Sequence, residues 1–219
     1  MTDIQIDKQI WASENLKENK FRNGDEIPIV DNWDDWAKHA INQSPCCAYV
    51  DNKPSNLKYG LFFNGYCLRD ERNICPIDYR LPQIIDILNL TKFLGFDSTR
   101  DDMEYYNGDV ATGLKSDKLW KKSLFGGPGD NSTKLSFLPG GNLTARDGLF
   151  LFDDKGTTAS HWLEDVHNPK EGAKYWPVPP SDWNQSRNHK FSIGTGGNNS
   201  LSVGAGFLFN GYFIRLMRI

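Results

Sequence analysis

Residues 59–82, YGLFFNGYCLRDERNICPIDYRLP, decide the fold of this chain. Their first part is apolar at three consecutive positions, 61–63, a pattern typical of a strand that is buried on both faces. A charged loop and a Cys-Pro corner at 75–76 follow, and a Leu-Pro step at 81–82 then places a proline where the first turn of a helix tolerates it. This order of strand, corner and helix indicates a role in architecture rather than in catalysis.

The segment that follows is the most helix-like part of the sequence. Its apolar residues predict a main helix over about residues 82–95, with one broad apolar stripe. The stripe is formed by Ile84, Ile85, Leu88 and Leu94. Gly95 is placed to end the helix in the left-handed conformation that glycine adopts at little steric cost.

Shorter elements are predicted upstream of this stretch. Residues 4–16 alternate apolar and polar side chains, which predicts two strands joined by a tight turn. Trp33 and Trp36 are three positions apart, so they share one face of a predicted short helix. Asp31 or Asn32 is expected to cap that helix.

Hairpins and loops are predicted downstream. Residues 142–145 and 149–152 form the arms of a candidate hairpin whose tip is residues 146–148. Residues 171–190 contain three prolines and two tryptophans and predict an irregular segment. No internal repeat or linker composition divides the chain, so we expect one α+β domain over residues 1–219.

Composition excludes several classes of partner. Hydrophobic residues make up 38% of the chain and aromatic residues 13%, with 20 glycines and 11 prolines. Such a chain favours short strands and long loops built around a few large side chains. The net charge of −3 offers no basic excess for nucleic acid, and no run of roughly 18 apolar residues predicts membrane insertion.

The four cysteines lie close together in the sequence but do not form a metal-binding pattern. They are Cys46, Cys47, Cys67 and Cys75, without the CxxC spacing of a zinc site. Buried thiols are the default expectation, and a local Cys67–Cys75 disulfide is the alternative. No cofactor is expected, and no residue pattern supports a structural calcium ion.

Six segments in register resemble the Fibrobacter succinogenes major paralogous domain family. They cover nearly the whole chain: IWASENL at 10–16, FRNGDEIP at 21–28, YGLFFNGY at 59–66, ICPIDYRLP at 74–82, FLPGGNLTARDGLF at 137–150 and GYFIRLMR at 211–218. The resemblance implies a C-type-lectin-like fold, with short twisted antiparallel strands and long loops. It also implies a binding role rather than an enzymatic one.

Two departures from the family pattern refine these expectations. Leu216 replaces the closing cysteine of the family, so Cys75 is not expected to bridge to the end of the chain. The sequence begins almost directly with the domain and shows no secretion signal, whereas many members of the family carry one. A bacteriophage virion protein assembled in the host cytoplasm fits that description, and a secreted or cell-surface adhesin domain is the alternative.

Catalytic and metal sites are not indicated by the sequence. The paired carboxylates at 34–35, 101–102 and 153–154 are interpreted as solvated loop charges, because neighbouring side chains on a strand point to opposite faces. The four histidines are scattered. Formylglycine-generating oxidases share the lectin-like architecture but use a C-terminal cysteine pair, and no cysteine follows Cys75. The chain is therefore not expected to be an enzyme.

The candidate binding residues lie in the irregular segment. They are Tyr175, Trp176, Trp183, Asn184, Arg187 and Asn188. Tryptophan, tyrosine and arginine dominate interface hot spots, although the two tryptophans are equally consistent with a place in the core. We expect a virion surface protein of the capsid, collar or tail. Its expected partners are other virion or surface proteins in an oligomeric assembly, and its candidate ligands are host glycans or surface proteins.

Overall fold

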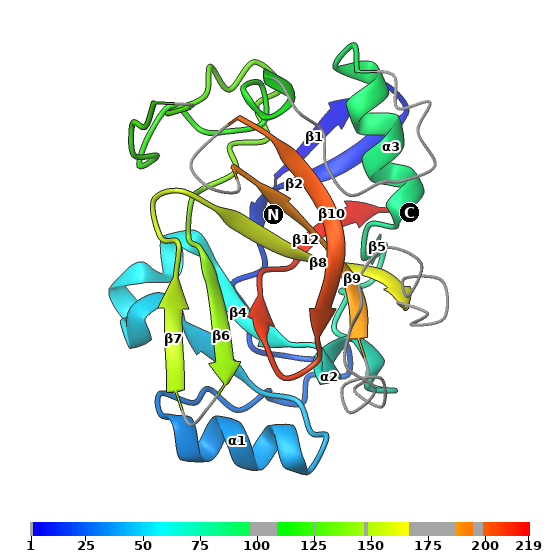
Figure 1. Ribbon diagram of the computed structural model, residues 1–219. Helices are drawn as coiled ribbons and strands as arrows, with labels where there is room; N and C mark the ends of the chain where they lie inside the picture. Colours follow the sequence, from blue (N-terminus) through cyan, green and yellow to red (C-terminus); the bar gives the residue numbers. More distant parts are fainter. Residues whose placement is uncertain (1, 97–108, 125, 147–148, 167–186, 195–198) are drawn as a thin grey trace, which may run out of the picture.

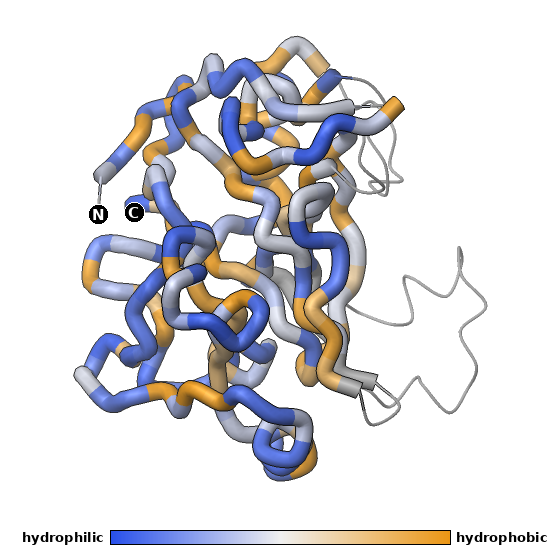
Figure 2. Tube along the Cα trace, turned by 90° about the vertical axis from the view of Figure 1, so that its left-hand side faces the viewer, coloured by the Kyte–Doolittle hydropathy of each residue, from blue (hydrophilic) through white to orange (hydrophobic). Residues whose placement is uncertain are grey.

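A computed structural model of the chain describes residues 2–96, 109–124, 126–146, 149–166, 187–194 and 199–219. Their strands form three sheets in which the paired strands run antiparallel, with short helices around them (Figure 1). The arrangement is α+β, as the sequence predicts. Apolar residues recur along the whole trace instead of collecting in one helix, which fits a core built by strands (Figure 2).

The first sheet joins the two ends of the chain. Its strands follow the order β1-β2-β12-β5, namely β1 (Asp3–Ile6), β2 (Gln9–Asn15), β12 (Arg215–Arg218) and β5 (Tyr79–Arg80). Ile4 pairs with Trp11 in the β1–β2 hairpin, which confirms the strand, turn and strand predicted over residues 4–16. Trp11 is fully buried, so this hairpin is anchored in the core.

The second sheet contains the strand of the stretch that opens the sequence analysis. Its order is β3-β4-β11-β6-β7, namely β3 (Cys47–Tyr49), β4 (Leu61–Asn64), β11 (Gly211–Tyr212), β6 (Asn142–Arg146) and β7 (Leu149–Asp153). Strand β4 has a neighbour on each side and all four of its residues are buried, which confirms a strand covered on both faces. The predicted hairpin is confirmed as β6 and β7, with each arm one residue longer than expected.

Gly141 shows why the Pro-Gly-Gly corner before this hairpin needs glycine. Its φ is +81°, a value that other residues rarely adopt. A Cβ atom at this position would lie 2.0 Å from the carbonyl oxygen of Asp153. The corner can therefore turn into β6 only because the residue has no side chain.

The third sheet lies next to the second. It has the order β10-β9-β8, with β8 (Ala159–Val166), β9 (Arg187–Ile193) and β10 (Leu201–Phe207). The backbone N–H of Trp162 donates to the carbonyl of Phe213 at 2.9 Å, and the N–H of Phe213 donates to the carbonyl of Ser160 at 3.0 Å. These bonds tie β8 to the segment between β11 and β12.

The helices cover the edges of this framework. They are α1 (Trp33–Ile41), α2 (Tyr66–Arg69) and α3 (Ile84–Phe93), with 3₁₀ turns η1 (Val50–Asn52), η2 (Pro54–Tyr59) and η3 (Asp109–Ala111). Asn32 caps α1, and its side-chain oxygen accepts a hydrogen bond from the N–H of Asp35 at 2.9 Å. This confirms one of the two predicted caps.

Helix α3 confirms the main predicted helix but corrects its buried face. The helix ends before Gly95, whose φ is +85°. Its fully buried residues are Asp86, Ile87, Leu90 and Thr91. Of the predicted stripe, Ile84 and Leu94 are partly buried and pack against the core, Leu88 is partly buried, and Ile85 is 54% exposed. The stripe is therefore correct only in part, and the buried Asp86, which binds Arg80 and caps the helix at Gln83, was not predicted.

All four cysteines are free and buried, so the predicted alternative of a Cys67–Cys75 disulfide is wrong. Burial raises the pKa of Cys47 to about 12 and that of Cys75 to about 11. Cys75 and Leu216 belong to the same buried apolar cluster. Packing therefore joins this corner to the last strand, at the position where the family pattern has a closing cysteine.

Candidate functional site

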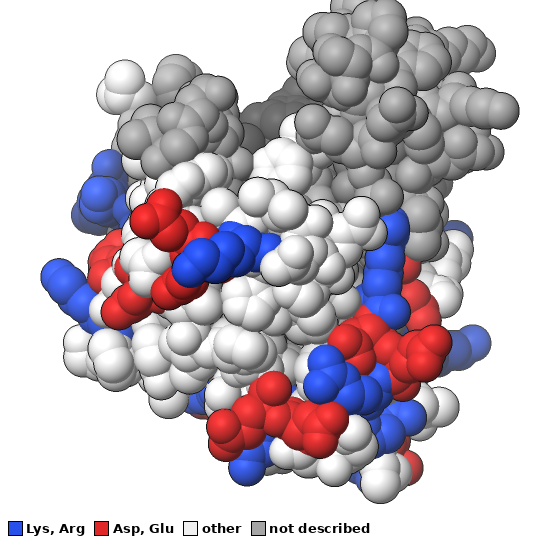
Figure 3. Space-filling view, turned by 90° about the horizontal axis from the view of Figure 1, so that it is seen from below, with Lys and Arg blue, Asp and Glu red and all other residues white. Residues whose placement is uncertain are grey.

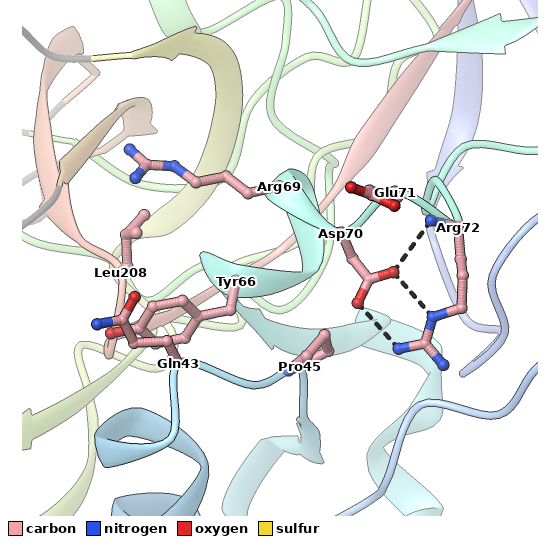
Figure 4. A pocket seen from close by; sticks show the side chains of 8 residues that line it. All are labelled: Gln43, Pro45, Tyr66, Arg69, Asp70, Glu71, Arg72 and Leu208. Atoms are coloured by element: carbon pink, nitrogen blue, oxygen red, sulfur yellow. Dashed lines mark hydrogen bonds and ion pairs between the residues drawn. The ribbon is translucent and has the colours of Figure 1, made fainter.

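A hollow of about 440 Å³ lies beside the short helix α2, at the centre of the stretch that opens the sequence analysis. Tyr66, Gln43, Pro45 and Leu208 line one part of it, and the charged residues 69–72 line the other (Figure 4). Strand β4 positions Tyr66 at the hollow, because α2, which starts with Tyr66, begins two residues after the strand ends. Gly65, the residue between them, fits only because it has no side chain: a Cβ atom there would lie 2.4 Å from the side chain of Leu208.

The charged part of the hollow is held by an ion pair between neighbours in the sequence. Nε of Arg72 donates to Oδ1 of Asp70 at 2.8 Å, and Nη2 donates to Oδ2 at 2.9 Å. Nη1 of the same guanidinium lies 3.2 Å from Oδ2 of Asp25. These hydrogen bonds from Arg72 lower the pKa of Asp70, which is therefore ionised at neutral pH. The guanidinium also stacks over the ring of Phe21, at 4.1 Å from its centroid.

A second hollow, of about 490 Å³, adjoins the first. It is lined by Arg22, Asn23 and Asn73, together with Glu71 and Arg72, which line the first hollow as well. The loop that carries Asn23 is a tight turn, as the sequence of this segment favours: Gly24 has a φ of +93° and its N–H donates to the carbonyl of Phe21. The N–H of Arg22 donates to the carbonyl of Asn73 at 2.8 Å, which joins the two loops.

Arg69 connects the first hollow to strand β9. It projects from the opposite side of α2 to Arg72 (Figure 4). Its Nε and Nη2 donate to Oδ1 of Asn188, at 3.1 and 2.9 Å. The Nδ2 group of Asn188 donates to the carbonyls of Leu163 and Glu164, both at 3.4 Å. Arg69 thereby fixes the start of β9 against the end of β8.

The candidate binding residues from the sequence are placed only in part. Tyr175, Trp176, Trp183 and Asn184 lie outside the described residues, so their binding role stays a prediction. Arg187 is the first residue of β9, and its side chain is not described. Asn188 is 2% exposed, and its carboxamide bonds within the protein rather than facing solvent.

Sequence reasoning missed the residues of the two hollows. Residues 69–73 were interpreted as a charged loop in an architectural stretch, and the run RDERN was the only local signal. Gln43 and Leu208 approach Tyr66 because β4 pairs with β3 and β11, which are distant in the sequence. The spacing of these residues along the chain does not predict that they lie close together in the fold.

Other polar groups serve the fold. Asp34 and Asp35 lie in the first turn of α1, where carboxylates interact favourably with the helix dipole. His161 is fully buried, and its Nε2 lies 3.1 Å from Oδ1 of Asn15. Within the described ranges, no group of three or more His, Cys, Asp or Glu residues could hold a metal ion. No helix in the same ranges is both long and apolar enough to cross a membrane.

Comparison with known proteins gives one match. A family model described as the Fibrobacter succinogenes major domain matches residues 4–203. The matched range ends within β10, so the similarity noted for residues 211–218 lies beyond it. No curated protein and no solved structure matches the chain.

Proposed function

The chain belongs to the Fibrobacter succinogenes major domain family, and on this premise we propose that it is a non-enzymatic recognition module. Its ligand binds in the hollow beside α2. The proposal rests on one observation: the ring of Tyr66 and the ion pair between Asp70 and Arg72 line the same solvent-open hollow. Side chains that are fixed before binding lose little conformational entropy when a ligand arrives.

The state of the four cysteines and of His161 supports a binding role. Cys46, Cys47, Cys67 and Cys75 are buried, and burial raises the pKa of each thiol, which leaves little reactive thiolate at neutral pH. Burial and the charge of Arg215 hold the pKa of His161 well below its usual range. None of these five residues lines either hollow. A formylglycine-type oxidase on the same architecture is the disfavoured alternative.

The proposal is tested by applying the purified chain to arrays of glycans and of surface proteins, with and without Ca²⁺. Tyr66→Ala is expected to abolish binding, because the ring is the main apolar contact of the hollow. Tyr79→Ala is the control, since Tyr79 is a partly exposed tyrosine on β5 that lines neither hollow. Circular dichroism verifies that both variants fold. Binding that survives Tyr66→Ala contradicts the proposed site, and a folded chain that binds no probe contradicts the recognition function.

Two further variants test the prediction made from the sequence. Trp183→Ala and Arg187→Ala change residues of the predicted binding segment and keep every described lining residue of the hollow beside α2. Loss of binding in these variants, with Tyr66→Ala unchanged, would move the site to that segment. Loss in both sets would indicate one surface that includes both regions, which the Arg69–Asn188 contact makes reasonable.

We propose further that the fold is of the C-type-lectin-like kind and that the protein acts at a virion surface. The lectin-like assignment is supported by the family resemblance and by the antiparallel sheets with long connections. An adhesin domain at a cell surface is the alternative. Mass spectrometry of purified phage particles and of bacterial outer membranes separates the two: recovery in membranes and not in particles contradicts the virion role.

A further inference from the structure

We propose that the two hollows are parts of one groove, here named the α2 groove, and that it binds a neutral linear oligosaccharide. The α2 groove is defined by Tyr66 at one end, by Glu71 and Arg72 in the middle, and by Arg22 and Asn23 at the other end. This inference rests on the proposed recognition function and specifies the chemical class of its ligand.

The two hollows adjoin at a shared wall, which supports a single groove. Glu71 and Arg72 line both hollows, so a ligand that extends past them contacts both. The volumes of about 440 and 490 Å³ each fall within the range of about 300 to 1,000 Å³ that is typical of small-molecule sites. Two such spaces in a row favour a chain-like ligand over a single compact one.

The charges in and beside the groove balance. Its described lining has three basic side chains, Arg22, Arg69 and Arg72, and two acidic ones, Asp70 and Glu71, while Asp25 lines neither hollow but pairs with Arg72. Figure 3 shows acidic and basic side chains mixed over the lower face of the molecule, rather than separated by sign. Electrostatic attraction of a charged ligand requires an excess of one sign, and these six groups together have none. A neutral ligand is therefore favoured.

The polar groups of the groove suit hydroxyl groups. A hydroxyl both donates and accepts a hydrogen bond. Asp70 supplies an ionised acceptor that Arg72 holds in place, and the guanidinium groups of Arg72 and Arg22 supply donors. Neighbouring hydroxyls of a sugar can use an acceptor and a donor together, while the apolar face of the sugar packs on the ring of Tyr66.

A peptide fits the groove less well. Peptides commonly bind by adding a strand to an open sheet edge or by placing apolar side chains in a groove. Strand β4, which leads into α2, has both of its edges paired. Among the described residues, the apolar lining consists of Pro45, Leu208 and the ring of Tyr66.

Calorimetric titration with three series of probes tests the inference. The probes are neutral oligosaccharides of one to six glucose or xylose units, oligouronates of the same lengths, and uncharged peptides of similar length. We expect binding of the neutral series only, with affinity that rises over the first few units and then levels off once both hollows are filled. Added salt should leave the affinity unchanged, because no net charge is neutralised.

Variants locate the ligand within the groove. Tyr66→Ala should weaken binding of the longer neutral probes about tenfold or more, as expected for an aromatic residue that dominates a binding site. Glu71→Gln, at the shared wall, should weaken the long probes more than the short ones. Glu18→Gln is the matched control: Glu18 is also exposed and lines neither hollow.

The outcomes separate this inference from the proposed function. Preference for oligouronates or peptides overturns the neutral oligosaccharide and leaves a recognition module. Equal affinities for one unit and six units overturn the continuous groove. Neutral probes that bind Tyr66→Ala and Glu71→Gln as tightly as the native chain overturn the α2 groove as their site. Absence of binding to all three series overturns the inference, and the arrays described above then decide the recognition function independently.

Discussion

Arg215 and Arg72 are each held by several polar groups, but Arg215 is 1% exposed whereas Arg72 lies at the surface. Arg72 pairs with two carboxylates, those of Asp70 and Asp25. The bonds of Arg215 go to uncharged oxygens: Nε donates to Oδ1 of Asn15 at 2.8 Å, and Nη1 donates to two backbone carbonyls at 2.9 and 3.0 Å. The same side-chain type thus has two environments.

The two environments give the two arginines different roles. Arg215 joins β12 to β2, and its partner Asn15 also bonds His161 of β8 at 3.1 Å, so three strands meet at one carboxamide oxygen. Burial lowers the pKa of Arg215 to about 9, and the group stays protonated at neutral pH. A buried charge of this kind stabilises the fold only while every partner is present. The ion pair of Arg72, in contrast, remains open to solvent and to a ligand.

The largest effect is expected from Arg215→Met. This change leaves Oδ1 of Asn15 and the carbonyls of Ala12 and Leu135 without their buried donor, and unsatisfied buried groups are costly. We expect the free energy of unfolding in urea to fall by about 3 kcal/mol. The control is Arg218→Met on the same strand, where the side chain is 50% exposed. Equal losses in the two variants would remove the distinction between buried and exposed arginine.

The second effect is a dependence of stability on pH through His161. Burial and the nearby Arg215 charge lower the pKa of this imidazole well below 6.5, while in the unfolded chain it has its ordinary value. Below about pH 6.5 the unfolded state therefore binds the extra proton, and the free energy of unfolding falls by up to about 1.4 kcal/mol per pH unit. The stability is present above this pH and is lost as the pH decreases.

Urea unfolding of the native chain and of His161→Gln, at several pH values from about 5 to 8, measures this dependence. His161→Gln should lose most of the slope below about pH 6.5. His39→Gln serves as the comparison: burial lowers the pKa of His39 as well, but His39 is only partly buried on α1 and bonds Ser44, so this variant should lose a smaller part of the slope. An unchanged slope in His161→Gln would show that the buried cluster does not govern acid stability.

The sequence predicts local elements of this molecule better than their assembly. The β1–β2 hairpin, the cap of α1 and the hairpin of β6 and β7 follow from alternation, capping and turn residues within a few positions. The buried position of Asp86 on α3 does not, because its contact with Arg80 is unrelated to apolar spacing. Local sequence patterns predict the secondary structure of a segment. Which of its side chains are buried depends in addition on contacts with residues elsewhere in the chain.

The candidate site shows the same limit more strongly. Residues 59–82 were correctly interpreted as a buried strand, a corner and a helix, but the hollow at their centre depends on Gln43 and Leu208, which only the sheet order brings near. Arg215 and Asn15 are 200 positions apart, and their contact is likewise a result of strand pairing. No spacing rule connects residues so far apart.

A third prediction concerns Arg69 and Asn188, which lie between the two extremes of the comparison. Asn188→Ala removes an acceptor of the Arg69 guanidinium and the donor to the carbonyls of Leu163 and Glu164. We expect a loss of about 1 to 2 kcal/mol in the free energy of unfolding. Asn89→Ala is the control, since Asn89 is exposed on α3 and alanine favours helix. A loss as large as that of Arg215→Met would show that the loss in the free energy of unfolding does not depend on how deeply the polar group is buried.

The smallest effect on stability is expected from Arg72→Ala. The ion pairs with Asp70 and Asp25 lie at the surface, where water and salt screen them, so the urea midpoint should shift only slightly. In about 1 M NaCl, where the screening length is about 3 Å, even this shift should vanish, whereas the loss in Arg215→Met should persist because salt does not reach the buried cluster. Ligand binding should respond in the opposite order, with Arg72→Ala weakening it although the fold is intact. If salt reduced both stability losses equally, the two arginines would share one electrostatic environment, and the assignment of Arg72 to recognition and Arg215 to the fold would be wrong.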